Sequence, residues 1–294
     1  MARILIAGCG YVGAATAELL HGRGWEVEGW TASADSAAQL AQIAAYPVRA
    51  VDLTDASAVE DAGGEFDVII QSASSRGGGA EDYRRIYFES ASHLTRTFPR
   101  AVLLFVSSTS VYAQTNGEWV TEEAPAAPER ATARLLRETE ELVLARAGMV
   151  ARLAGIYGPG RSALLRKFLE GSARLGPDSD RFVNQVHRDD VATALCLLAE
   201  SALQPAAADL PRIYNVSDNH PLSQRACYEW LAAHFQRPLP MLSDAAPTRK
   251  RGNSNKRVSS DKLQALGWSP RYPSFAEGMV ASVLPGWTQT ARDR

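Results

Sequence analysis

The sequence has few cysteines, no long apolar run and no excess of either charge. Its three cysteines, Cys9, Cys196 and Cys227, lie far apart and show neither CxxC nor histidine-rich metal spacing, so neither a disulfide framework nor a zinc site is indicated. No stretch approaches the ~18 uninterrupted apolar residues of a membrane span, which excludes a transmembrane helix. The apolar run that starts at Ile4 breaks at Gly8, too early for a signal peptide. These absences predict a reduced, cytoplasmic protein.

The charge balance excludes a further class of function. The chain holds 31 lysines and arginines against 33 aspartates and glutamates, so it is not a globally basic nucleic-acid binder. Of its 294 residues, 46% are hydrophobic and 22% are charged, which is typical of a globular protein with ample material for a core. This length suits one large or two modest domains. We expect the partner to be a small-molecule substrate rather than nucleic acid or a membrane.

The N-terminal half predicts a parallel sheet. Short runs rich in β-branched residues alternate there with longer amphipathic stretches, which is typical of repeated strand–helix–strand units. The expected strands are Arg3–Ala7, Glu26–Trp30, Val48–Val51, Val68–Gln71, Val102–Ser107 and Met149–Leu153. The expected helices are Val12–His21, Ser36–Ala45, Ala56–Ala62, Tyr83–Phe98 and Arg130–Ala147. Strands with apolar residues on both faces belong inside a doubly wound α/β sheet.

The regular alternation ends near Gly155, and proline, glycine and charged residues become denser. We therefore expect a first domain over residues 1–155, with segment 186–216 packing back onto it, and a smaller α+β region over residues 156–294. Two helices are expected in that second half, at Asp189–Glu200 and Ser223–His234. Ser223 precedes its helix as an N-cap.

The strongest local signal is the turn from Gly8 to Gly13. It directly follows an expected strand and opens an expected helix, which is the context in which a GxGxxG pattern indicates dinucleotide binding. Gly8 permits the tight turn, Gly10 lets the backbone approach a pyrophosphate, and Gly13 lets helix and strand pack closely. The helix start, which includes Tyr11 and Val12, presents backbone N–H groups to phosphates. The turn predicts a dinucleotide-binding, Rossmann-type first domain.

The end of the second strand bears on the choice between NAD and NADP. A carboxylate there usually holds the ribose hydroxyls of NAD, but this sequence has Thr31 and Ser33 and neither an acid nor an arginine. These hydroxyls can bond a 2′-phosphate, which favours NADP over NAD without excluding either. Asp35 is the nearest carboxylate, and we interpret it as the cap of the next helix.

Several motifs occur together in one order along most of the chain. They are Gly8–Gly13, Val51–Leu53, Gln71–Ser74, Ser107–Tyr112, Arg152–Gly160 and Val186–Ala192. With these motifs the sequence resembles the short-chain dehydrogenase/reductase superfamily, in its extended and atypical branch of NAD-dependent epimerases and dehydratases. The resemblance implies an NAD(P)-binding Rossmann fold with a C-terminal substrate region.

The resemblance also implies roles for residues near the strand ends. Asp52 and Leu53 would meet the adenine, and Ser72 and Ala73 would line the path to the nicotinamide. Ser108 would face the reacting carbonyl, at the C-terminal end of a central strand where open parallel sheets bind ligands.

Further residues of these motifs would lie near the substrate. Thr109 and Ser110 would contact it, and Tyr157 belongs to the stretch that matches the loop over the nicotinamide. For His93 and His187, which stand near family motifs, a structural role is favoured over a catalytic one.

The pattern breaks where redox members of the superfamily carry a Tyr-x-x-x-Lys pair. The helix expected over residues 130–147 contains neither residue type. Aligning the family's downstream glutamate on Glu140 puts Thr132 and Leu136 at the pair, whereas aligning it on Glu141 gives Ala133 and Arg137. The tyrosine normally moves a proton and the lysine lowers its pKa, so a substitute is required. Tyr83, Tyr112 and His187 are the candidates.

Two functions remain open at this stage. One is an oxidoreductase or epimerase/dehydratase-like enzyme acting on a small carbonyl or hydroxyl compound or on a sugar nucleotide, with an altered catalytic set. The other is an inactive NAD(P)-binding sensor or regulatory protein, which the missing pair favours. The basic segment 248–257, with Arg249, Arg251, Lys256 and Arg257, is either a solvated loop or a binding site for an anionic substrate.

Overall fold

The computed structural model describes residues 1–75, 77–204, 211–243 and 254–290. The chain forms two compact units. Unit 1 comprises Met1–Val111, Ala126–Arg152 and Val191–Tyr214, and unit 2 comprises Tyr112–Pro125, Leu153–Asp190 and Asn215–Arg294. Residues 191–214 of unit 1 fall within the segment 186–216 that was expected to pack onto the first domain, whereas residues 112–125, within the expected first domain, belong to unit 2.

Unit 1 is built around a sheet of seven strands. Their order is β11-β7-β5-β4-β1-β2-β3, and the pairings from β3 through β2, β1 and β4 to β5 are parallel. The strands are β1 (Arg3–Ala7), β2 (Glu26–Thr31), β3 (Val48–Ala50), β4 (Val68–Gln71), β5 (Val102–Ser108), β7 (Met149–Leu153) and β11 (Ile213–Val216). The last two strands each end in unit 2. The strand order reverses between β1 and β4, where doubly wound sheets bind their ligands.

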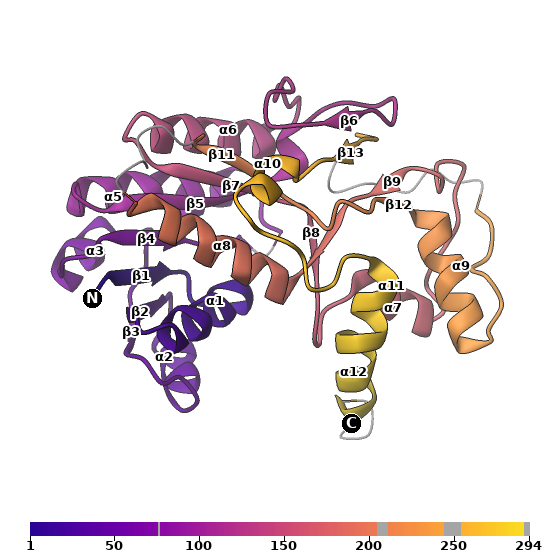
Figure 1. The fold of residues 1–294 in the computed structure, drawn as a ribbon, viewed down its shortest axis with the longest axis horizontal. Coiled ribbons are helices and arrows are strands. Elements are labelled where there is room, and N and C mark those ends of the chain that lie inside the picture. The colour runs from indigo at the N-terminus through magenta and orange to yellow at the C-terminus, as the bar shows by residue number, and fades with distance from the viewer. Residues whose placement is uncertain (76, 205–210, 244–253, 291–294) are drawn as a thin grey trace. The chain divides into compact units, whose positions relative to one another are not determined.

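Helices cover both faces of this sheet. They are α1 (Tyr11–Gly22), α2 (Ala34–Ala41), α3 (Ala56–Ala62), α4 (Ala80–Tyr83), the π-helix η1 (Arg84–Glu89), α5 (Ser90–Thr97), the 3₁₀ turn η2 (Thr109–Val111), α6 (Ala131–Leu144) and α8 (Arg188–Ala202). An ion pair of 2.7 Å between Arg23 and Glu200 joins α1 to α8. In Figure 1, α6 lies beside β5 and α1 lies beside β1.

The core of unit 1 follows from the position of β1. Because β1 lies between two strands and two helical layers, Ile4, Leu5 and Ile6 are all fully buried, as expected for a central parallel strand. On the neighbouring strand β2, the fully buried Trp30 lies edge-on to Phe66, with ring centroids 6.2 Å apart.

Unit 2 consists of short strand pairs and helices. Its strands are β6 (Trp119–Val120), β8 (Gly155–Tyr157), β9 (Phe182–Val183), β10 (Gln185–His187), β12 (Leu222–Ser223) and β13 (Arg257–Val258). Its helices are α7 (Ala163–Leu169), α9 (Gln224–Phe235), α10 (Asp261–Ala265), α11 (Phe275–Gly278), the π-helix η4 (Met279–Val283) and α12 (Leu284–Thr290). Apolar side chains of α7, α9, α11 and η4 form one buried cluster. The doubly wound α/β sheet and the smaller C-terminal region are therefore both confirmed.

Most expected elements of the N-terminal half are present, and the differences have local causes. The helix expected over Arg130–Ala147 ends at Leu144, and Ala147 then adopts a left-handed φ of 54°. The helix expected at Ser36 starts earlier, because Ser33 accepts a hydrogen bond from the backbone N–H of Ser36 and caps α2. The interpretation of Asp35 as that cap was wrong, since Asp35 lies in the first turn.

No helix among the described residues is long and apolar enough to cross a membrane. In the same part of the chain, no group of three or more histidine, cysteine, aspartate or glutamate side chains is placed to hold a metal ion. Cys9, Cys196 and Cys227 are all buried free thiols.

Candidate cofactor and active site

The turn after β1 has no room for side chains at two of its glycines. Gly8 has a φ of 99°, and a Cβ there would lie 2.2 Å from the backbone N of Ala73. A Cβ on Gly13 would lie 2.6 Å from the carbonyl oxygen of Gly8. The turn is fixed to β2, because the carbonyl of Trp30 accepts hydrogen bonds from the backbone N–H groups of Gly8 and Cys9 at 3.1 and 2.7 Å.

Gly10 differs from these two glycines. It is the N-cap of α1, makes no side-chain cap, and a Cβ there would meet nothing within 4 Å. The start of α1, with the half-buried Tyr11 and the buried Val12, therefore opens onto free space beside Gly10. A helix N-terminus with open space before it is a ready site for an anion.

Ser72 and Ala73 form the wall of the same turn. The hydroxyl of Ser72 donates to the carbonyl of Gly8 at 2.9 Å, and its backbone N–H donates to Ala7 at 2.8 Å. The structure thus brings together the ends of β1 and β4, the two strands at which the sheet order reverses.

The hydroxyls at the end of β2 both have partners within the chain. Thr31 Oγ1 donates to the carbonyl of Ser33 at 3.3 Å. Ser33 Oγ caps α2 and lies 3.0 Å from Ser36 Oγ. Both hydroxyls are therefore engaged at the start of α2.

The segment after β3 is also held by side chains. Asp52 is exposed, and its carboxylate accepts hydrogen bonds from the N–H and the hydroxyl of Thr54, both at 2.9 Å. The next residue, Leu53, has its carbonyl 3.0 Å from His93 Nδ1. Because a carbonyl only accepts, Nδ1 carries the proton, and His93 holds the loop.

Ser108 ends β5 and begins the group of hydroxyls predicted to meet the substrate. Its Oγ accepts a hydrogen bond from the backbone N–H of Ser110 at 3.2 Å, so its own O–H remains a donor. Ser108 and Ser110 are half-buried, whereas Thr109 is buried.

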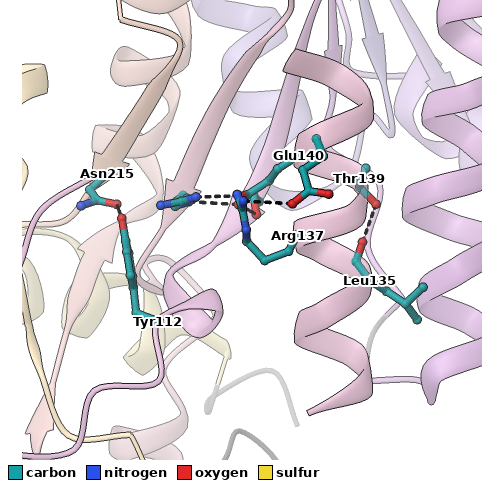
Figure 2. Close-up of polar contacts among 9 residues, drawn as sticks. Tyr112, Leu135, Arg137, Thr139, Glu140 and Asn215 are labelled. Carbon is teal, nitrogen blue, oxygen red and sulfur yellow. Dashed lines mark hydrogen bonds and ion pairs between the residues drawn. The ribbon is translucent and has the colours of Figure 1, made fainter. Parts of the chain in front are cut away.

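The neighbouring Ser107 belongs to a buried ion-pair network that sequence reasoning missed. Glu140 of α6 is fully buried and accepts hydrogen bonds from Ser107 Oγ at 2.6 Å and from Arg152 Nε and Nη2 at 3.0 and 2.7 Å. Arg137 forms a further ion pair with it (Figure 2). The available signals were an arginine inside the apolar strand Met149–Leu153 and a glutamate on the apolar face of α6.

In unit 2, His187 is fully buried, and both of its ring nitrogens have hydrogen-bond partners within the chain. Its Nδ1 accepts the backbone N–H of Asp189 at 3.2 Å, so Nε2 carries the proton and donates to Ser282 Oγ at 3.0 Å. Burial lowers the pKa of His187 to about 4. Its ring centroid lies 4.0 Å from that of Tyr272.

Tyr157 is 1% exposed and donates its hydroxyl to the carbonyl of Ser274 at 3.1 Å. Burial raises the pKa of this phenol above its ordinary value. Its role as a substrate contact stays a prediction. Tyr112 is likewise fully buried and donates to Asn215 Oδ1 at 2.9 Å (Figure 2).

The basic segment 248–257 is only partly within the described residues, and Arg249 and Arg251 lie outside them. Lys256 is not solvated: it is 5% exposed and donates to the carbonyl of Tyr112 and to Ser254 Oγ, each at 2.9 Å. Burial lowers the pKa of Lys256 to about 8. Arg257 lies over the ring of Trp119, 5.2 Å from its centroid.

With this geometry established, comparison with known proteins decides the family. The sequence profile of the NAD dependent epimerase/dehydratase family matches residues 4–217. The chain belongs to this family. It is also 34% identical over 286 residues to Protein YeeZ of Escherichia coli K12, covering 93% of this chain and 97% of that protein.

Solved structures of the family have the same fold. A protein of Methylobacillus flagellatus, assigned as an NAD-dependent epimerase/dehydratase, superposes with a TM-score of 0.77 at 28% identity, covering 98% of this chain and 99% of that one. UDP-glucose 4-epimerase of Thermus thermophilus, solved in complex with NAD, gives a TM-score of 0.78 at 23% identity, with coverage of 98% and 99%. At that identity the second likeness shows the fold alone.

The family binds NAD(P), and the residues of unit 1 fit such a cofactor. Gly8 and Gly13 pack against backbone, Gly10 opens onto free space, and α1 begins beside it. This is the donor set and the room that a diphosphate needs.

The helix expected to carry the tyrosine and lysine is α6, and it contains neither. Glu140 is its buried glutamate, whereas the side chain of Glu141 is 66% exposed. The alignment on Glu140 places Thr132 and Leu136 at the pair, and Leu136 is 3% exposed.

Proposed function

We propose that this chain binds NAD(P) at the carboxyl ends of β1 and β4 and acts as an oxidoreductase or epimerase/dehydratase. Its substrate would be a small carbonyl or hydroxyl compound or a sugar nucleotide. The observation that carries the proposal is the turn from Gly8 to Gly13, with its open space at Gly10 and the start of α1 beside it. Membership of the NAD dependent epimerase/dehydratase family supports it.

When bound, the nicotinamide supplies hydride transfer. The chain's own residues then position the reactants. The N-terminus of α1 holds the diphosphate, and Asp52 and Leu53 lie where the adenine is expected. Ser108 offers its O–H to the oxygen of the substrate, with Thr109 and Ser110 beside it.

The end of β2 favours NADP in this proposal. Thr31 and Ser33 stand where a carboxylate would repel a 2′-phosphate, and the N-terminus of α2 adds backbone N–H groups. We expect NADPH to bind at least as tightly as NADH, which a fluorescence titration of both reduced cofactors measures.

The decisive variant is Gly10→Ala. The added methyl group enters the space through which the diphosphate approaches, but it meets nothing within 4 Å of the chain. We expect the dissociation constant for NADPH to rise by about tenfold or more, equivalent to ~1.4 kcal/mol, without a loss of thermal stability.

Gly22→Ala is the matched control, because Gly22 lies at the other end of α1 and its Cβ also meets nothing within 4 Å. It should leave cofactor affinity unchanged. Equal affinity in Gly10→Ala and the wild type would contradict the proposed site.

A second function, an inactive NAD(P)-binding sensor, is favoured by one observation: α6 lacks both tyrosine and lysine. Oxidation of NADPH against a panel of carbonyl compounds and sugar nucleotides separates the two. Turnover that Ser108→Ala reduces supports the enzyme. Tight cofactor binding with no turnover of any panel member supports the sensor.

A further inference from the structure

The helix between β4 and β5 contains a wide turn that is tied to a strand end. α4, η1 and α5 follow one another from Ala80 to Thr97, and η1 is π-helical. Gln71 Nε2 donates to the carbonyls of Tyr87 at 3.1 Å and Ile86 at 3.4 Å, both inside η1. Gln71 is the last residue of β4 and is 1% exposed. Single π turns inside α-helices occur frequently at functional sites.

The phenol of Tyr87 lies at the same edge of the sheet. Its Oη accepts a hydrogen bond from the backbone N–H of Ser75 at 3.3 Å, so the O–H itself remains a donor. Its ring lies edge-on to Phe105 of β5, with centroids 6.1 Å apart. Tyr87 is half-buried, so part of its side chain is open to the surface.

Ser75 belongs to the segment that also walls the glycine turn. That segment begins with Ser72, whose hydroxyl donates to Gly8. In a doubly wound sheet the two halves of a dinucleotide lie on either side of the strand reversal, with the ribose next to the adenine read at the end of β2. The nicotinamide half consequently belongs over β4 and β5, where Tyr87 lies.

The neighbouring helix offers no competing phenol. α6 packs against η1, as the 3.5 Å ion pair between Arg84 and Glu138 shows, and α6 contains no tyrosine. Tyr87 thus supplies from η1 the kind of side chain that α6 lacks.

We propose that Tyr87 faces the nicotinamide end of bound NAD(P) and is the phenolic donor at that end. Gln71 is its positioning residue, since it fixes the turn from which Tyr87 projects. This inference rests on the proposed cofactor binding and adds to it a residue that no sequence motif of the chain indicated.

The test uses the full chain labelled with 3-fluorotyrosine, and ¹⁹F spectra resolve its nine tyrosines. The signal that disappears in Tyr87→Phe belongs to Tyr87. Spectra are recorded with saturating NADP⁺ and then with saturating NADPH. Reduction removes the charge and the aromaticity of the nicotinamide, so a fluorine that faces it changes its chemical shift. We expect the Tyr87 signal to differ more between the two forms than any other tyrosine signal.

Tyr83→Phe is the matched control, because Tyr83 lies one turn earlier and its ring is 4.9 Å from that of Tyr87. This variant should leave unchanged the difference in the chemical shift of the Tyr87 signal between the NADP⁺ and NADPH complexes. Gln71→Met removes both hydrogen bonds to η1 and should shrink that difference.

The two proposals fail in distinguishable ways. If the chain binds both cofactor forms and the Tyr87 signal is the same in each, the assignment of Tyr87 is overturned and cofactor binding stands. If unlabelled wild-type chain binds neither form, the proposed function is overturned, and the role of Tyr87 with it.

Discussion

At the scale of single residues, the buried pair of Glu140 and Arg152 makes unit 1 sensitive to the loss of either charge. Both side chains are 2% exposed or less, so neither charge is screened by water. Removing one partner of a buried pair leaves the other charge uncompensated, which costs about 3–5 kcal/mol.

We expect Glu140→Gln to lower the free energy of unfolding by about 3–5 kcal/mol, as measured by urea denaturation. Glu60→Gln is the control, because Glu60 and Arg96 form an ion pair of 3.0 Å in which both side chains are more than half exposed. That change should cost at most about 1 kcal/mol. Similar losses of unfolding free energy in the two variants would show that burial does not determine how much these ion pairs contribute to stability.

Residues whose role is local could be predicted from the sequence, and residues with distant partners could not. The tight turn at Gly8 and the close packing at Gly13 could be predicted because the turn is contained in six consecutive residues. Lys256 was placed in a basic segment that would be a solvated loop or an anion-binding site, but it is buried against Tyr112, which is 144 residues away. The carboxylate of Asp190 likewise accepts the backbone N–H groups of Arg271 and Tyr272, more than 80 residues along the chain, at 2.6 and 3.0 Å.

At the scale of elements, α9 begins where the sequence predicts. Ser223 is its N-cap and accepts the backbone N–H of Ala226 at 3.0 Å. We expect Ser223→Ala to lower the free energy of unfolding by about 1 kcal/mol, because one N–H of the first turn loses its partner. Ser223→Asp keeps an acceptor at this position and should retain most of the stability. Chemical denaturation of the wild type and the two variants measures these free energies of unfolding. Equal losses in both variants would exclude capping as the cause.

The helix before β5 shows what periodicity cannot predict. An amphipathic pattern over Tyr83–Phe98 correctly indicated a helix, but it did not indicate the π turn of η1. That turn is fixed by Gln71, 16 residues before Tyr87. A helical repeat of 3.6 residues reflects the pattern within the helix itself, so it cannot predict a partner outside the helix.

At the scale of the whole molecule, the pH dependence of stability has a contribution from Asp218 in unit 2. This carboxyl group is 4% exposed. Its Oδ1 accepts the N–H of His220 at 3.0 Å, and among the described residues its Oδ2 has no partner. Burial, together with the nearby Asp190 carboxylate, raises the pKa of Asp218 from 3.8 to about 7.

The sign of this contribution follows from the raised pKa. Between pH 3.8 and 7 the folded chain holds a proton on Asp218 that the unfolded chain has released, so this group's contribution to stability falls as the pH rises through that range. The full difference is at most about 4 kcal/mol.

We expect Asp218→Asn, which cannot ionise, to gain stability relative to the wild type as the pH rises from 5 to 8. Urea midpoints at unit pH intervals measure this difference. Asp180→Asn, at a side chain that is 74% exposed, should show no such trend. A difference between Asp218→Asn and wild type that does not depend on pH would contradict the assignment.

The doubly wound sheet was predictable because six of its strands are marked by apolar runs with helices between them. The seventh strand, β11, was not among the expected strands, although segment 186–216 was expected to pack onto the first domain. β11 is short, comes after the regular alternation has ended, and is defined by its pairing with β7, which no local pattern encodes.

The place of β11 at the edge of the sheet has a consequence for biosynthesis. Its neighbour β7 ends at Leu153, and β11 starts only at Ile213, so the ribosome must add a long intervening stretch before the two can pair. Until then the nascent chain presents β7 as an open edge, which is a template for pairing with strands of other chains. A polypeptide released from the ribosome before residue 213 would keep that edge, and we expect such truncated products to aggregate.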